Sequence, residues 1–218
     1  MSIARSYLFE YNDTIVKENG MLSKNLDYYV IRIVEDIFEV LMNTKKPMPE
    51  EIFKLVNTIE KRKKMELIIE ETLRNVSYEE YEKSLGLFKI VSPGCIDTAY
   101  LNPGFDNHFF HVSDYLYIFY DCETIDNIWS AKKGIIKINY KDFVNEFKLF
   151  VYNFMNDMEK RINETICFLN VDLLDLKKEH NERLNSFEDM FKKIEIGHNV
   201  ELAQWDNTIE LAKKYKVI

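Results

Sequence analysis

The chain has 218 residues, of which 46% are hydrophobic, 14% aromatic and 30% charged, and its formal net charge is −8. This length suits one full domain, and the apolar content excludes a disordered chain. The acidic balance argues against nucleic-acid binding, which requires clustered Lys and Arg to displace counterions from phosphates.

Cysteine usage and the N-terminus indicate the compartment. The three cysteines, Cys95, Cys122 and Cys167, are an odd number without CxxC spacing, so we expect neither a disulfide framework nor a zinc ribbon. The N-terminus lacks the apolar segment of a signal peptide. No apolar run approaches the roughly 20 residues that span a bilayer. We therefore expect a soluble, cytoplasmic protein without membrane contact.

The first third of the chain is predicted to be mostly helical. Alternating aromatic residues in Ala4–Tyr11 indicate one short strand. Apolar residues at helical spacing predict helices from about Asn25 to Asn43 and from Glu51 to about Asn75. The second helix contains the basic run Lys61–Lys64, which we interpret as a solvated face neutralised by neighbouring glutamates rather than as a phosphate-binding patch.

A short helix follows this basic helix. The segment Ser77-Tyr78-Glu79-Glu80 matches a capping box, in which Ser and Glu satisfy free backbone amides at the helix start. Tyr78, Tyr81 and Leu85 lie at helical spacing, and Gly86 is a residue type that commonly ends helices. The sequence therefore predicts a helix of about two turns that ends at Gly86.

The second half begins with four segments rich in aromatic and β-branched residues: Asp97–Leu101, His108–Val112, Tyr115–Tyr120 and Ile135–Tyr140. Their short links favour antiparallel pairing. Three helices are expected to follow, at about 141–163, 172–194 and 200–214. The predicted fold is α+β: a small antiparallel β-meander of about four to five strands, packed against a majority of α-helices. We expect a single domain over 1–218, in which 1–92 is a possible helical subdomain and 93–218 holds the meander and C-terminal helices.

A search for catalytic and metal-binding patterns yields no catalytic residue, metal ligand or cofactor site. His108 and His111 are three apart in a predicted strand, so they point to opposite faces and do not share a metal ion. His180 lies on an apolar helix stripe, as a buried histidine would. There is no Gly-rich phosphate loop and no serine elbow. We therefore expect a protein that is not an enzyme.

One loop carries residues that packing does not explain. Asp121, Glu123 and Asp126 place three acids within six residues, and Trp129 follows them. An acidic loop flanked by an aromatic residue is typical of a surface that binds a basic partner. A solvated acidic surface, with Trp129 in the core, is the alternative. We predict Asp121, Glu123, Asp126 and Trp129 as partner-binding residues.

The same region resembles a family. An aromatic meander, a loop ending in Trp129 and a helix closing on Met158-Glu159-Lys160-Arg161 are similar to immunity proteins of bacterial polymorphic-toxin, contact-dependent-inhibition loci. The last helices, with Glu179-His180-Asn181-Glu182-Arg183 and Gln204-Trp205-Asp206, look like the same grouping. The resemblance covers roughly residues 97–218 and transfers no functional residue.

The resemblance implies a non-enzymatic protein that binds and neutralises a cognate toxin domain, plausibly a nuclease with a basic face, through an acidic surface. Two alternatives remain open at this point. One is a metal-dependent hydrolase that uses the loop carboxylates, and the other is a helical adaptor for protein interactions.

Overall fold

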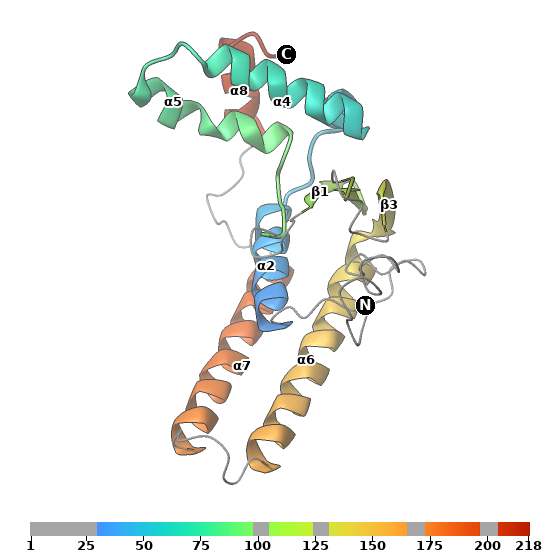
Figure 1. The fold of residues 1–218 in the computed structure, drawn as a ribbon, viewed down its shortest axis with the longest axis vertical. Helices are drawn as coiled ribbons and strands as arrows, with labels where there is room; N and C mark the ends of the chain where they lie inside the picture. The colour runs from blue at the N-terminus through green and yellow to red at the C-terminus, as the bar shows by residue number, and fades with distance from the viewer. Residues whose placement is uncertain (1–29, 98–104, 124–130, 165–172, 197–204) are drawn as a thin grey trace, which may run out of the picture. The chain divides into compact units, whose positions relative to one another are not determined.

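The computed structural model describes residues 30–97, 105–123, 131–164, 173–196 and 205–218. These residues form seven α-helices, one 3-10 helix and a three-stranded antiparallel sheet, so the α+β prediction is confirmed (Figure 1). The chain divides into two compact units, one of residues 1–138 with 201–218 and one of residues 139–200.

The first unit combines six helices with the sheet. Its helical elements are α2 (Val30–Asn43), α3 (Glu50–Val56), α4 (Ile59–Leu73), α5 (Tyr78–Ser84), the 3-10 helix η1 (Leu85–Ile90) and α8 (Trp205–Lys214). Its strands are β1 (Asp106–Val112), β2 (Tyr115–Asp121) and β3 (Lys133–Asn139).

Local capping explains where the early helices begin. Thr58 has an extended backbone and its side chain accepts a hydrogen bond from the Lys61 N–H, so the predicted helix 51–75 is divided into α3 and α4. The predicted cap at Ser77 is confirmed, because its Oγ accepts from the Glu80 N–H at 3.3 Å. Helix α5 ends at Ser84 with Leu85 as its C-cap, so Gly86 stands directly after the helix as predicted, and the chain continues as the 3-10 helix η1. A Cβ on Gly86 would lie 3.1 Å from Leu211, so glycine there permits α8 to approach.

The meander is confirmed in its order, β1-β2-β3, and in the antiparallel pairing of β1 with β2. The turn between these strands contains Ser113, whose φ of 52° lies in the left-handed region. The described residues contain three strands, fewer than the predicted four to five. The strand expected at Ala4–Tyr11 lies outside the described residues.

Hydrogen bonds at the outer edge of β1 join it to residues 94–96, just before the predicted strand Asp97–Leu101, of which only Asp97 is described and is not in a strand. The Phe109 N–H donates to the Gly94 carbonyl at 2.8 Å. The Asn107 side chain then takes both backbone groups of Ile96, accepting at 2.7 Å and donating at 2.9 Å. The Asn107 side chain thus takes the hydrogen bonds that a neighbouring strand would make with the backbone of Ile96. Residues 98–101 themselves lie outside the described residues.

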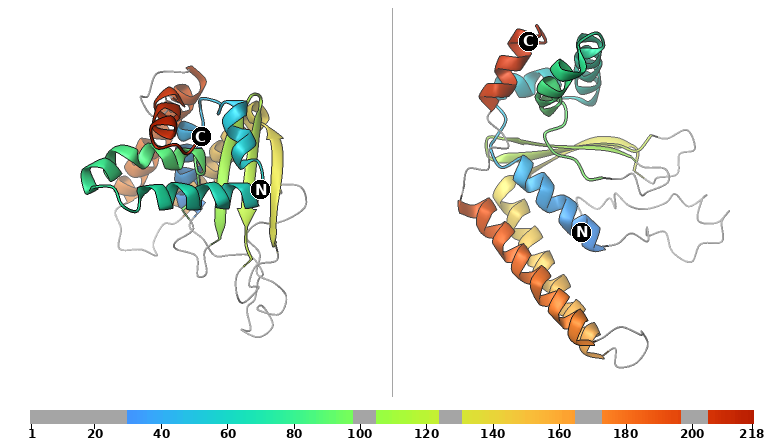
Figure 2. Two further views of the ribbon diagram at one scale, coloured as in Figure 1. Left: turned by 90° about the horizontal axis from the view of Figure 1, so that it is seen from above. Right: turned by 90° about the vertical axis from the view of Figure 1, so that its left-hand side faces the viewer.

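The sheet of this unit is covered on both faces, as the right-hand view of Figure 2 shows. Phe110, Val112 and Phe119 lie on one face and belong to a core with residues of α3, α4, η1 and α8. The ring of Phe53 in α3 stands 4.7 Å from that of Tyr117. On the other face lies α2, and the carbonyl of Thr44, just after that helix, contacts His111 of β1.

The second unit is a pair of long helices, α6 (Tyr140–Glu164) and α7 (Leu173–Ile196). The rings of Phe147 and Phe191 lie 5.8 Å apart. Lys148 pairs with Glu195 at 2.7 Å and also lies over the Phe191 ring. The helices predicted at 141–163 and 172–194 are therefore confirmed. His180 of α7 is 7% exposed, so its predicted burial is confirmed too.

An ion pair between a buried arginine and a carboxylate that is 40% exposed joins α4 to the start of β1. The side chain of Arg62 is 2% exposed, and its guanidinium donates to Asp106 at 2.5 Å and to Glu66 at 3.1 Å. The interpretation of the basic run as a solvated face is therefore wrong for Arg62. The next residue, Lys63, is 50% exposed and pairs with Asp121 at the end of β2 at 2.6 Å. Adjacent residues of one helix thus hold the paired ends of two strands, since Asp106 and Asp121 are cross-strand partners.

We expect Asp106→Ala to lower the free energy of unfolding by about 3 kcal/mol, because it leaves a buried guanidinium short of a counter-charge. Chemical unfolding followed by tryptophan fluorescence measures the loss. The matched control is Asp121→Ala, which leaves a half-exposed lysine and costs about 1 kcal/mol or less. Equal losses in the two variants would contradict the structural role assigned to Arg62.

Candidate functional site

The predicted partner-binding loop begins with Asp121, whose carboxylate is occupied. One oxygen pairs with Lys63 at 2.6 Å, the other accepts the Glu123 N–H at 3.1 Å, and the side chain is 11% exposed. Burial acts to raise the pKa of Asp121, but the hydrogen bonds and the charge of Lys63 outweigh it, so the pKa lies below its usual value. Asp121 is therefore an ionised carboxylate whose charge is already compensated.

Glu123 is more open than Asp121. Its carboxylate lies 3.2 Å from Lys133 and is about half exposed. The hydrogen bond with Glu123 raises the pKa of Lys133. The structure thus brings Asp121 and Glu123 together, each beside a lysine, while Asp126 and Trp129 lie outside the described residues. Across the described part of the chain, no three His, Cys, Asp or Glu side chains gather where they could hold a metal ion.

A second acidic surface lies on α5, and the sequence analysis did not single it out. Tyr78, Tyr81 and Leu85 are 79%, 38% and 43% exposed. Their spacing places them on one side of the α5–η1 segment, with exposed Glu79, Glu80 and Glu82 beside them. We call these six residues the α5 surface. The sequence pattern that could have revealed it is Tyr-Glu-Glu-Tyr-Glu, which has too few aliphatic residues for a packed helix face.

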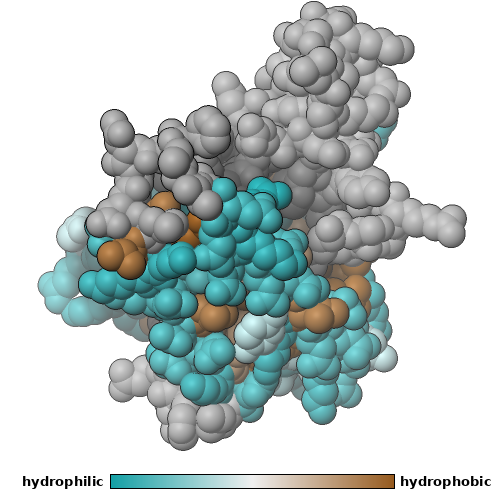
Figure 3. All heavy atoms as spheres, turned by 90° about the horizontal axis from the view of Figure 1, so that it is seen from below, coloured by the Kyte–Doolittle hydropathy of each residue, from teal (hydrophilic) through white to brown (hydrophobic). Residues whose placement is uncertain are grey.

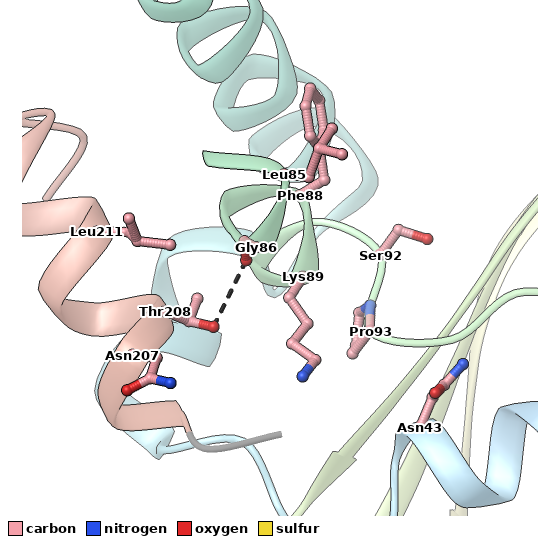
Figure 4. A pocket seen from close by; sticks show the side chains of 10 residues that line it. All are labelled: Asn43, Leu85, Gly86, Phe88, Lys89, Ser92, Pro93, Asn207, Thr208 and Leu211. Atoms are coloured by element: carbon pink, nitrogen blue, oxygen red, sulfur yellow. Dashed lines mark hydrogen bonds between the residues drawn. The ribbon is translucent and has the colours of Figure 1, made fainter. Parts of the chain in front are cut away.

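A cavity of about 470 Å³ adjoins the α5 surface, and Leu85 belongs to both. It is lined by Asn43, Leu85, Gly86, Phe88, Lys89, Ser92, Pro93, Asn207, Thr208 and Leu211. Figure 4 shows the Lys89 side chain extending between Asn207 and Asn43. Burial lowers the pKa of Lys89. The volume of the cavity falls within the range of small-molecule sites.

The two strand histidines make separate contacts, so the prediction that they point to opposite faces of β1 is confirmed. His108 lies between Ser92 and Asp106, with its ring nitrogens 3.0 and 2.6 Å from their side-chain oxygens. His111 is 8% exposed, and its Nδ1 donates to the Thr44 carbonyl at 2.8 Å. Burial lowers the pKa of His111.

Two cysteines lie in the described residues, and both thiols are held protonated. Cys122 is buried, and burial together with Asp121 raises its pKa to about 12. Cys95 is exposed as a residue, but partial desolvation of the thiol raises its pKa as well. A thiolate is the nucleophilic form of cysteine, so neither is an activated nucleophile at neutral pH.

Comparison with known proteins gives one match. Residues 1–208 match a family of unknown function, DUF5984. The chain belongs to this family. No curated protein matches the chain. No solved structure matches it either.

The described surface is largely polar on the face shown in Figure 3, where the hydrophobic residues form small, separated patches. None of the helices in the described ranges combines the length and apolarity needed to cross a membrane.

Titration of His111 gives a testable pH dependence. Because its pKa is lower in the folded state than its usual 6.5, the unfolded chain binds more protons just below that pH. Stability should therefore fall as pH decreases from about 6.5 toward the folded-state pKa. Urea unfolding at a series of pH values measures the slope. His111→Asn retains a donor for Thr44 without a titratable ring and should reduce this slope. An unchanged slope would contradict the assignment.

Proposed function

We propose that this chain is an immunity protein that binds a cognate bacterial toxin domain and neutralises it. The α5 surface carries the proposal, because it exposes two tyrosines and a leucine on a helix that the fold holds in place. Tyrosine is enriched among the residues that dominate binding energy at interfaces. The resemblance of residues 97–218 to immunity proteins supports the identity of the partner as a toxin.

The charge around α5 defines the chemistry of the partner. Between Glu70 and Ser84 there are five acidic and two basic residues, a net charge of −3 out of −8 for the whole chain. Lys83 is already paired with Glu79 at 2.5 Å. Complementary charge speeds association and excludes partners of like charge. A toxin domain with a basic face, such as a nuclease that binds phosphates, fits this surface.

Neutralisation of this kind is steric and takes place where the toxin acts, which we propose to be the cytoplasm. It requires no reaction by the chain, no cofactor and no contact with nucleic acid. Asp121 and Glu123 lie on another part of the same unit, and their lysine partners leave less uncompensated charge than α5 carries. The α5 surface is therefore the better-supported interface, and Asp121, Glu123, Asp126 and Trp129 remain a second predicted one.

We expect the double variant Tyr78→Ala/Tyr81→Ala to weaken binding of the co-encoded toxin domain by about 30-fold or more, since loss of a hot-spot side chain costs upward of 1 kcal/mol. Isothermal titration calorimetry with the purified toxin domain measures the dissociation constant. Growth of cells that make both proteins reports neutralisation. Both tyrosines are exposed, so the variant should melt at the temperature of the wild type.

The matched control is Tyr115→Ala, which removes a tyrosine from the start of β2 whose exposure, 41%, is close to the 38% of Tyr81. It should bind as the wild type does. Full growth inhibition by the toxin in the presence of the wild-type chain would refute neutralisation. Neutralisation that survives loss of both α5 tyrosines would instead place the interface elsewhere, with the loop at Asp121 as the next candidate.

A further inference from the structure

Three side chains from two separate segments form a row, and the first of them, Ser92, lines the cavity. The Ser92 Oγ lies 3.0 Å from Nδ1 of His108, and Nε2 of His108 lies 2.6 Å from a carboxylate oxygen of Asp106. Asp106 and His108 share one face of β1, two residues apart, whereas Ser92 follows η1. A hydroxyl, an imidazole and a carboxylate in series are the arrangement that activates a serine nucleophile.

The hydrogen bonds define where the proton of His108 resides. An ionised carboxylate only accepts hydrogen bonds, so Nε2 carries the proton and donates it to Asp106. In the neutral imidazole, Nδ1 then accepts the hydrogen bond that the Ser92 hydroxyl donates. The two ring nitrogens are used in the reverse of their order in trypsin-like proteases. Either nitrogen of imidazole accepts a proton, so this reversal preserves the chemistry.

The carboxylate of the row is fixed from the opposite side. Arg62 donates to the second oxygen of Asp106, so this carboxylate cannot turn away from His108. Burial acts to raise the pKa of Asp106, but the hydrogen bond from His108 and the charge of Arg62 help to lower it below its usual value. Asp106 therefore stays ionised at neutral pH. The side chain of His108 is only 10% exposed, which limits rotation of the ring.

Ser92 is placed at the cavity wall by local backbone structure. Its N–H donates to the Phe88 carbonyl at 2.8 Å, which ties it to the end of η1. The residue is half-buried and lines the cavity, and Figure 4 shows its hydroxyl turned toward the strands. The apolar residues of the wall, Leu85, Phe88, Pro93 and Leu211, would suit a short acyl chain.

We propose that Ser92 is a nucleophile that hydrolyses small carboxylic esters, with His108 as general base and Asp106 as the residue that orients it. The Ser92 oxygen attacks the acyl carbon while its proton moves to Nδ1 of His108. The carbon–alkoxide bond then breaks, and Nδ1 returns the proton to the departing alcohol. Water attacks the acyl-serine by the same route, which releases the acid and restores the hydroxyl.

The three side chains of the row lie outside the α5 surface, and the cavity shares only Leu85 with that surface. Ser92 and His108 are not part of the α5 surface, so loss of the serine hydroxyl should leave toxin binding unchanged. The activity would add a reaction to a chain that we expected, from its sequence, to have none. The sequence patterns for serine hydrolases rely on a glycine-flanked serine, and Ser92-Pro93-Gly94 does not fit them.

The experiment treats the full chain with a fluorophosphonate probe, which phosphonylates activated serines with loss of fluoride, and locates the adduct by peptide mass spectrometry. Hydrolysis of p-nitrophenyl acetate and butyrate is measured in parallel. We expect the adduct on Ser92 and a rate at least about 100-fold lower in Ser92→Ala. The rate should also fall at least about 100-fold in His108→Gln, which removes the base.

Cys95→Ala is the matched control, because a thiol near Ser92 can also react with activated esters, and it should retain full rate and labelling. A thermal melt of each variant confirms that it is folded. Labelling of another residue, or equal hydrolysis by the wild type and a folded Ser92→Ala, would overturn the proposal. Either result would mean that the hydrogen bonds among Ser92, His108 and Asp106 are structural and serve only to hold Asp106 beside Arg62.

Discussion

The ion pair between Arg62 and Asp106 is the interaction on which most of the first unit depends. A guanidinium that is 2% exposed is costly to remove from water, and only a close carboxylate with good geometry compensates for it. Asp106 can meet this need only when α4 lies across the beginning of β1. The pair therefore fixes the position of the helix on the sheet more strictly than the apolar contacts beside it, which tolerate small displacements.

The Asp106 carboxylate takes part both in the packing of α4 against the sheet and in the hydrogen bonds that lead to Ser92. Asp106 contacts Arg62 through one oxygen and His108 through the other, and His108 reaches Ser92 beyond it. A row of this kind rigidifies the core when every member is satisfied. It also gives a serine hydroxyl a base and an orienting carboxylate. Packing and reactivity thus make the same demand on these side chains, and only a chemical readout distinguishes the two roles.

The α5 surface consists of side chains that the core does not bury. Elsewhere in this unit, aromatic residues such as Phe53, Phe110 and Phe119 are drawn into the core between the helices and the sheet. Helix α5 instead leaves Tyr78 largely exposed. Membership in a family of unknown function adds no constraint on what this surface meets. Its charge and its exposed rings are what favour a basic protein partner.

The sequence by itself determined the element types, since periodicity and capping act locally: the cap at Ser77, the helix α6 and the pairing of β1 with β2 all follow from neighbouring residues. It also indicated that His108 and His111 point apart, because strand alternation is local too. Only the tertiary structure decided that Arg62 is buried while Lys63 is not, and that Tyr78 and Tyr81 are exposed. It alone brought Ser92 to His108, 16 residues away. These outcomes depend on which segments meet across the core, and spacing along the chain does not encode that.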